Sequence, residues 1–240
     1  MYSLKHLKWS GLFLIFFLTG CSATEFTIDR DSIWGRYAVG PLSDSLDWFA
    51  KLLFDEYGLA LLVITVIVRL IVLPLTLKQY RSSKQMQALQ PELKKIREKY
   101  STDTKKQQEE TMKLFQKNGV NPLSGCFPLL VQMPVLFALY YAILGNPEIR
   151  EHDFLWVQLG TADATLILPI LAAVTTFLQQ FMMQSQMPSN MKFLLILFPV
   201  LIFVTSINFP SALVLYWVYS NLFTIVQTYF IYKPGLKEVK

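Results

Sequence analysis

The charged residues of this 240-residue chain are segregated from its apolar residues, and this segregation limits the fold more than any other feature. After residue 57 the chain holds five apolar segments that contain a single charged residue, Arg69. The segments are approximately 58–77, 127–144, 164–184, 193–207 and 211–232. Charged residues make up only 16% of the chain, whereas a soluble domain carries about 25%. Because so few polar groups cannot cover the apolar surface in water, we expect an integral membrane protein.

The lengths of these segments predict membrane-spanning helices. A helix rises about 1.5 Å per residue, so roughly 20 residues cross the hydrocarbon core of a bilayer. Segment 193–207 falls below this length, and we expect a short or tilted helix there. Only residues 208–210 separate it from the last segment, which predicts a tight antiparallel hairpin. The predicted fold class is an all-α integral membrane protein with five transmembrane helices.

The distribution of Lys and Arg between the loops predicts the orientation. Loops 78–126, 185–192 and 233–240 contain 11, 1 and 3 Lys or Arg residues, respectively. Loop 145–163 contains one, beside four acidic residues, and segment 21–57 contains three against seven acidic residues. Because positively charged loops stay in the cytoplasm, the first three loops and the C-terminus are expected inside and the other two regions outside. The basic residues thus report orientation, and no direct nucleic-acid ligand is expected.

The N-terminus has the features of a signal peptide with a lipid attachment site. Basic residues precede the apolar run 11–18, which is too short to cross a bilayer. The tetrapeptide Leu18-Thr19-Gly20-Cys21 resembles the bacterial lipobox, in which cleavage precedes a Cys whose thiol carries a diacylglycerol. We therefore predict a signal peptide over residues 1–20 and lipidation of Cys21. An ordinary signal peptide with an incidental Cys is the alternative. With Cys21 lipidated, Cys126 has no partner for a disulfide.

Segment 78–126 is expected to form a basic helical hairpin in the cytoplasm. Apolar residues within 86–100 recur at spacings of three and four, which predicts a stripe on a charged helix that Pro91 would kink. Thr104 and Gln107 would form a capping box at the start of the second helix. The hairpin could have a binding role, or it could be a solvated spacer without one.

A short amphipathic helix is predicted within the external segment 21–57. Leu42, Leu46, Phe49 and Leu53 recur at helical spacing on one face, and aromatic residues flank that face. A helix of this kind suits the membrane interface.

Arg69 is the strongest functional signal in the sequence. It lies about 11 residues into the first apolar segment, hence about 16 Å from its outer end and near the middle of the bilayer. A charge at that depth costs roughly 2.5–3.5 kcal/mol on insertion scales and therefore suggests a functional site. The alternative is that its long side chain extends towards the inner interface, near Lys78, without a further role.

Neutral polar residues form stripes on the predicted spans, whereas no span contains Asp, Glu, Lys or His. A single stripe could hold two helices together by hydrogen bonds. Several stripes and a lone Arg instead suggest a wet groove that keeps the guanidinium hydrated. The candidate groove residues are Arg69, Thr65, Gln132, Gln180, Gln184, Trp217 and Asn221.

A positively charged groove without an acidic residue of its own suits a ligand that carries negative charge. The spans lack the carboxylates or His that a proton relay would need, which argues against a proton-coupled transporter. The chain also lacks paired carboxylates, a Ser/His/Asp set, an HExxH motif and a phosphate loop, and both His6 and His152 lie outside the spans. We therefore expect no enzymatic activity, no metal and no cofactor.

The order and spacing of these features resemble the YidC/Oxa/Alb membrane-protein insertases, in the lipoprotein form found in Gram-positive bacteria. The resemblance covers almost the whole mature chain. It rests on Val68-Arg69-Leu70 followed by Leu73-Pro74-Leu75, on the basic hairpin, on Pro128–Pro134 (PLLVQMP), and on Pro210–Trp217 (PSALVLYW) with Asn221 beyond.

The resemblance implies a five-helix fold with a hydrophilic groove that opens to the cytoplasm and the lipid and is closed outside. It implies that Arg69 attracts acidic residues in the external tail of a nascent membrane protein, whose apolar segment then moves into lipid without ATP. Implied partners are nascent membrane proteins, membrane lipids, the Sec translocase and the ribosome. The tail 233–240 holds only three Lys residues, so ribosome binding would fall to the hairpin.

Two other classes of protein stay open at this stage. A transporter of small solutes or lipids would need a carboxylate or an ion site in the spans. A purely structural membrane lipoprotein would have no use for a costly mid-membrane Arg69.

Overall fold

The computed structural model describes residues 28–120, 127–184 and 192–232 of the chain. The predicted signal peptide at 1–20, the lipidation site Cys21 and the tail 233–240 lie outside the described residues. So does nearly all of the predicted loop 185–192.

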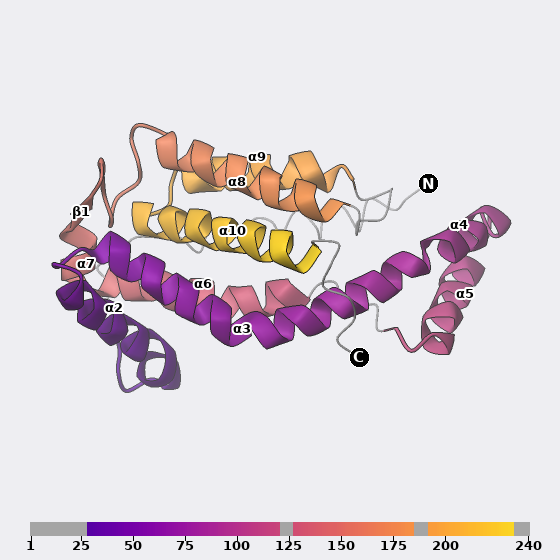
Figure 1. The fold of residues 1–240 in the computed structure, drawn as a ribbon, viewed down its shortest axis with the longest axis horizontal. Helices are drawn as coiled ribbons and strands as arrows, with labels where there is room; N and C mark the ends of the chain where they lie inside the picture. Colours follow the sequence, from indigo (N-terminus) through magenta and orange to yellow (C-terminus); the bar gives the residue numbers. More distant parts are fainter. Residues whose placement is uncertain (1–27, 121–126, 185–191, 233–240) are drawn as a thin grey trace, which may run out of the picture.

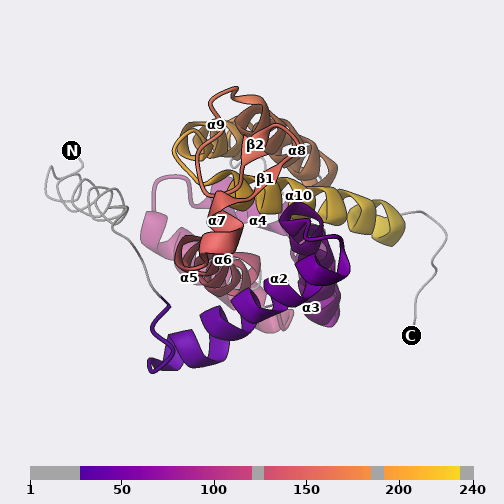
Figure 2. The same ribbon diagram turned by 90° about the vertical axis from the view of Figure 1, so that its left-hand side faces the viewer.

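The described chain is mainly helical. Its elements are, in order, η1 (Gly35–Val39), α2 (Gly40–Leu52), α3 (Tyr57–Ala88), α4 (Gln90–Lys99), α5 (Thr104–Lys117), α6 (Phe127–Gly145), α7 (Pro147–Glu151), β1 (Asp153–Phe154), β2 (Val157–Gln158), α8 (Ile167–Met183), α9 (Leu194–Ser206) and α10 (Ser211–Tyr232). The helices α3, α6, α8, α9 and α10 form an elongated bundle (Figure 1). The helices α4 and α5 project from one end of it, and α2, α7 and the two strands lie at the other (Figures 1 and 2).

Helix α3 is longer than the apolar segment from which it was predicted. It continues past Leu77 to Ala88, so its 32 residues extend for about 48 Å. Within the described ranges α3 is the one helix long and apolar enough to cross a membrane by itself, whereas the apolar helices at 132–145, 167–183 and 194–206 are shorter. Helix α4 begins directly after α3, with Pro91 in its first turn, where a missing N–H is tolerated. Pro91 therefore marks a helix start and not the predicted kink.

The helices α4 and α5 form an antiparallel pair with its own small core. Leu89 and Leu93 of the first arm pack with Leu114, Phe115 and Val120 of the second. The predicted stripe is therefore buried inside the pair.

Helix α5 is capped differently from the prediction. The predicted capping box of Thr104 and Gln107 is wrong, because Asp103 caps α5 by accepting a bond of 3.0 Å from the Lys106 amide. The Gln107 side chain instead donates to the Arg97 carbonyl of α4 at 3.4 Å.

The region 145–163 is more ordered than a simple loop, and the all-α prediction omits its two-stranded hairpin. The pair β1–β2 is antiparallel, with Phe154 opposite Val157. The carbonyl oxygen of Thr161 accepts both the amide and the hydroxyl of Ser211 at 2.7 Å, and the Leu159 carbonyl accepts the Ala212 amide at 2.9 Å. Region 145–163 therefore satisfies the first amides of α10, which would otherwise lack partners.

Polar contacts fasten α2, α3 and α7 together at the same end. The Tyr57 hydroxyl lies 3.0 Å from Asp47 Oδ1 and 2.7 Å from Glu148 Oε2. The Asn146 side chain caps α7 and donates to Asp47 at 2.7 Å and to Ser43 at 3.0 Å. We call this end of the bundle, formed by α2, α7 and region 145–163, the closed end.

Burial declines along α3 away from the closed end. Ala60, Leu61, Ile64 and Thr65 are buried, whereas none of the side chains described between residues 66 and 88 is. The other helices of the bundle contribute to the same core, for example Ile143 of α6 and Leu168 of α8. The bundle is therefore tightly packed at the closed end and looser at the end from which α4 and α5 project, which we call the open end.

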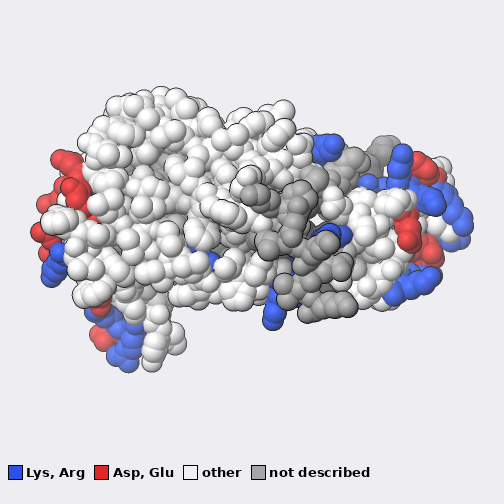
Figure 3. All heavy atoms as spheres, in the orientation of Figure 1, with Lys and Arg blue, Asp and Glu red and all other residues white. Residues whose placement is uncertain are grey.

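Charged residues gather at the two ends of the molecule, and the face between them is almost free of charge (Figure 3). Large apolar side chains are exposed along this middle part, among them Ile71, at 70%, and Ile196, at 69%. Soluble monomers rarely expose such a continuous apolar surface. Its surroundings are therefore lipid, in agreement with the predicted membrane location.

Asp163 gives a test of the closed end. It is 4% exposed and accepts hydrogen bonds from the Thr165 amide and hydroxyl and from the Leu168 amide at the start of α8. Burial alone would raise the pKa of Asp163, but these hydrogen bonds outweigh it and hold the pKa below its usual value. A carboxylate with a lowered pKa stabilises the folded state above its unfolded pKa, and the contribution is lost as the pH falls through the folded pKa.

We therefore expect Asp163→Asn to lower the stability of the detergent-purified protein at pH 7 by about 1–3 kcal/mol, because one amide oxygen cannot accept all the hydrogen bonds that the two carboxylate oxygens accept, and a buried donor left unpaired costs this much. The difference from wild type should begin to shrink as the pH falls below about 4, where Asp163 is protonated in the unfolded state, and should be smallest below the lowered folded-state pKa, where Asp163 is protonated in both states. Asp31→Asn, at an exposed position, is the control and should change little. A difference between Asp163→Asn and wild type that is the same at every pH would contradict the assignment.

Candidate functional site

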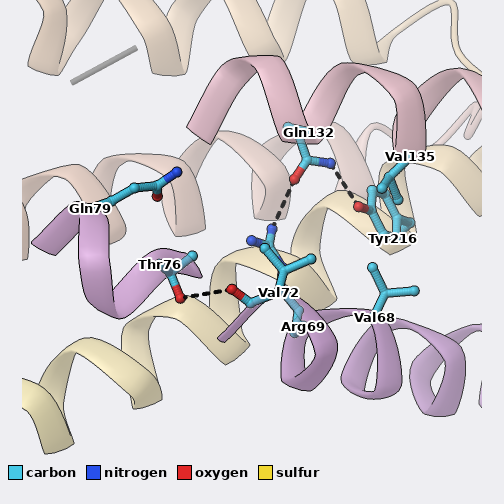
Figure 4. Close-up of a pocket in the computed structure, with 8 residues that line it drawn as sticks. All are labelled: Val68, Arg69, Val72, Thr76, Gln79, Gln132, Val135 and Tyr216. Carbon is cyan, nitrogen blue, oxygen red and sulfur yellow. Dashed lines mark hydrogen bonds between the residues drawn. The ribbon is translucent and has the colours of Figure 1, made fainter. Parts of the chain in front are cut away.

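Three helices contribute to the surroundings of Arg69. Its Nη2 donates a hydrogen bond of 3.2 Å to Gln132 Oε1 of α6. Gln132 Nε2 in turn donates to the hydroxyl of Tyr216 on α10 at 2.7 Å (Figure 4). Because Tyr216 is buried, its hydroxyl has a fixed position and orients the Gln132 amide. That amide in turn accepts the hydrogen bond from the Arg69 guanidinium.

Helical spacing aligns the polar residues of α3. Arg69, Val72, Thr76 and Gln79 follow one another at intervals of three and four residues, which places them on one face of the helix. The Thr76 hydroxyl donates to the Leu73 carbonyl at 2.8 Å and accepts from Gln227 Nε2 of α10 at 3.1 Å. This face of α3 is therefore bonded to α6 at Arg69 and to α10 at Thr76, which lies closer to the open end.

These residues surround a small cavity between α3, α6 and α10 with a volume of ≈ 40 Å³. Its lining consists of Val68, Arg69, Val72, Thr76, Gln79, Gln132, Val135 and Tyr216 (Figure 4). A cavity of this size with polar walls has room for a few waters. It lies beyond the last buried residue of α3, Thr65, on the side of the open end.

The cavity carries a positive charge without a matching acid. None of its lining residues is acidic, and the ion pairs found among the described residues involve other side chains, all outside the bundle helices. Removing a charge from water is costly unless it is paired or hydrogen-bonded, and a single neutral amide meets only part of this requirement. The site is therefore suited to water or to an incoming anion.

A second polar cluster joins α8 to α10. Asn221, which is 5% exposed, donates to the hydroxyls of Thr175 at 3.1 Å and Thr176 at 2.9 Å, and Trp217 Nε1 donates to Thr176 at 3.2 Å. Adjacent residues on a helix point about 100° apart. Tyr216 can therefore face Arg69 while Trp217 faces α8.

The structure brings together only part of the predicted groove. Arg69 and Gln132 line the cavity, whereas Trp217 and Asn221 belong to the α8–α10 cluster. Thr65 is 1% exposed and donates to the Leu61 carbonyl of its own helix at 2.7 Å.

The two glutamines predicted on the third span do not line the cavity either. Gln180 and Gln184 are both partly exposed. The Gln180 Oε1 atom is shielded from solvent and has no partner among the described residues.

The candidate groove residues omit three polar residues that line the cavity: Thr76, Tyr216 and Gln79. Tyr216 lies in a run of apolar and aromatic residues, where nothing distinguishes its hydroxyl from that of a lipid-facing Tyr. Gln79 follows Lys78, which was taken as the inner boundary of the first span. Extending the three-and-four spacing from Arg69 past that boundary would have found Gln79.

The described residues contain no cluster of three or more His, Cys, Asp or Glu side chains that could hold a metal ion. The guanidinium and the neutral polar groups at the cavity offer hydrogen bonding and Coulomb attraction.

Comparisons with known proteins extend over the whole site. The model of the 60Kd inner membrane protein family matches residues 48–238. The membrane protein insertase MisCA of Bacillus subtilis (strain 168) is 49% identical over 241 residues, which cover 97% of this chain and 92% of the relative. The membrane protein insertase YidC 2 of Bacillus anthracis is 49% identical over 231 residues, which cover 92% of this chain and 90% of the relative.

A solved structure gives the same result for the fold. The active YidC insertase crystal structure with its first transmembrane domain resolved matches with a TM-score of 0.68 and 28% identity. The match covers 95% of this chain but 52% of that one, so the present chain spans about half its length.

Proposed function

This chain belongs to the 60Kd inner membrane protein family of YidC-type membrane protein insertases, and we propose that it draws the polar tail of a client membrane protein into the cavity at Arg69. The client is a nascent integral membrane protein. The observation that carries the proposal is the guanidinium bound by one neutral amide beside a cavity with room for a few waters, without an acidic partner among the lining residues.

Coulomb attraction supplies the capture step. At an effective dielectric constant near 20, two unit charges 4 Å apart attract by about 4 kcal/mol before desolvation is subtracted. If only a quarter of this survives, about 1 kcal/mol remains, which changes binding roughly five-fold. Acidic groups in the client tail would thus be held transiently and not trapped.

The packing gradient supports a direction of transfer. We propose that α3, α6, α8, α9 and α10 are the five transmembrane helices, with the closed end outside and the open end in the cytoplasm. A tail could then enter from the cytoplasm as far as Arg69 and would meet the packed core beyond it. Partitioning of the client's apolar segment into lipid supplies the free energy, so no ATP is needed.

The remaining parts of the chain have supporting roles in this proposal. The predicted apolar face of α2 packs into the core of the bundle through Leu46, and its exposed Trp48 and Leu52 would lie at the outer interface of the bacterial cell membrane. The basic pair α4–α5, whose apolar residues except Met112 are mostly turned inward, presents a charged surface that could meet the ribosome, the client or the Sec translocase. The transporter alternative gains no support from the site.

The first test varies the charge at residue 69 and in the client together. We expect Arg69→Ala to reduce insertion of a client with an acidic tail about five-fold and to spare the same client with a neutral tail. Arg69→Lys should retain much of the activity because charge matters more than bidentate geometry, and Arg69→Glu should be worst for acidic clients. The measurement is insertion into vesicles of one client whose tail acids are neutralised stepwise. Equal fractional loss in Arg69→Ala at every tail charge would refute charge capture.

A separate prediction concerns the lipid anchor that we propose for the outer surface. Mass spectrometry of the purified protein should find an N-terminal Cys21 that carries a diacylglyceryl thioether, with residues 1–20 removed. Cys21→Ser should remain unprocessed at that position. An intact N-terminus or a free Cys21 thiol in the wild type would rule the anchor out.

A further inference from the structure

Gln79 is the lining residue of the Arg69 cavity nearest the open end. It lies on the same face of α3 as Arg69 and Thr76, which precede it in the chain and are labelled in Figure 4. Its Nε2 atom is shielded from solvent and has no hydrogen-bond partner among the described residues. An unpaired buried donor is unfavourable, so this amide is suited to donate a hydrogen bond to a ligand that enters the cavity.

The neighbouring polar groups do not serve as that partner. Gln132 uses its oxygen on Arg69 and its nitrogen on Tyr216. Thr76 donates to Leu73 and accepts from Gln227. Among the lining residues, the N–H groups left for a bound client are therefore those of Gln79, the second N–H of Gln132 and the remaining ones of Arg69.

The separation of Gln79 and Arg69 limits which pairs of acceptors in one peptide can bind both residues at once. Ten residues separate their backbone positions along α3, a rise of about 15 Å, and both side chains line the same cavity, so this rise is the upper limit for the separation of their donor groups. An extended peptide advances about 3.3–3.6 Å per residue, so two acceptors no more than four or five residues apart can reach both donors. Backbone carbonyls and carboxylates are the acceptors that a client tail offers, and a carboxylate is the stronger.

We propose that Gln79 is a specificity-determining residue that binds an acceptor of the client tail within four or five residues of the acid held at Arg69. This inference rests on the proposed function, because it takes Arg69 as the second point of attachment. Gln79 reaches the tail from the open end, and Arg69 reaches it deeper in the bundle. Together they select extended tails that carry two suitably spaced acids.

The experiment uses clients with one fixed tail acid and a second acid placed one to eight residues away. In the wild-type protein, insertion into vesicles should peak at a spacing of no more than four or five residues between the two acids and should fall at longer spacings. Gln79→Leu should abolish the peak, about a three- to ten-fold loss at that spacing, and should spare the single-acid client. Gln85→Leu makes the same change at an exposed position of α3 and should keep the peak.

A second variant guards against a general packing defect. Gln79→Glu keeps the size of the side chain but repels a carboxylate, so it should selectively depress the client with the favoured spacing. A flat spacing profile in wild type, a peak that survives Gln79→Leu, or an equal loss for all clients in both variants would overturn the inference. The last result would mean that Gln79 only binds water in the cavity.

These outcomes are separable from those of the proposed function. If Arg69→Ala shows the expected coupling to tail charge while the spacing profile is flat, only the role of Gln79 is wrong. If Arg69→Ala shows no such coupling, charge capture itself is wrong, whatever the spacing profile shows.

Discussion

The architecture depends on a single unpaired positive charge within an apolar bundle. Arg69 is bound by Gln132, which is bound in turn by Tyr216, so three helices meet at one guanidinium. Among the described residues, one neutral amide binds the guanidinium and no acid does. Under the proposed function, a permanent carboxylate partner would neutralise the site and remove its attraction for a client. The proposed capture step therefore depends on the incomplete pairing of Arg69.

The rest of the molecule keeps this charge accessible from one end. The contacts of Tyr57 with Asp47 and Glu148, and the hydrogen bonds of region 145–163 to Ser211, fasten the closed end. Packing on α3 stops at Thr65, one helical turn before Arg69. The α8–α10 cluster around Asn221 strengthens the wall of the bundle without adding polar groups to the cavity. One face of α10 thus packs against α8 through Trp217 and Asn221, and another face carries Tyr216 at the Arg69 cavity.

The membrane location, the helical segments and a polar environment for Arg69 were predictable, because hydropathy and a charge within an apolar segment are local signals in the sequence. The division of the polar stripes was not. Whether Trp217 faces Arg69 or α8 depends on the rotation of α10 against its neighbours, which spacing along one helix does not specify. Gln79 was missed because α3 continues beyond its apolar part. The order within 145–163 arises from long-range contacts, such as Ser211 with Thr161, that no local pattern predicts.

The central claim is that the cavity at Arg69 opens towards the cytoplasm and is sealed from the outside. Single-cysteine variants in a background without Cys21 and Cys126, labelled by a membrane-impermeant thiol reagent, test it directly. Thr76→Cys should be labelled in inverted vesicles and not in right-side-out vesicles, whereas Thr65→Cys, in the packed core, should be labelled in neither. Labelling of Thr76→Cys from the outside, or of Thr65→Cys from either side, would contradict the account.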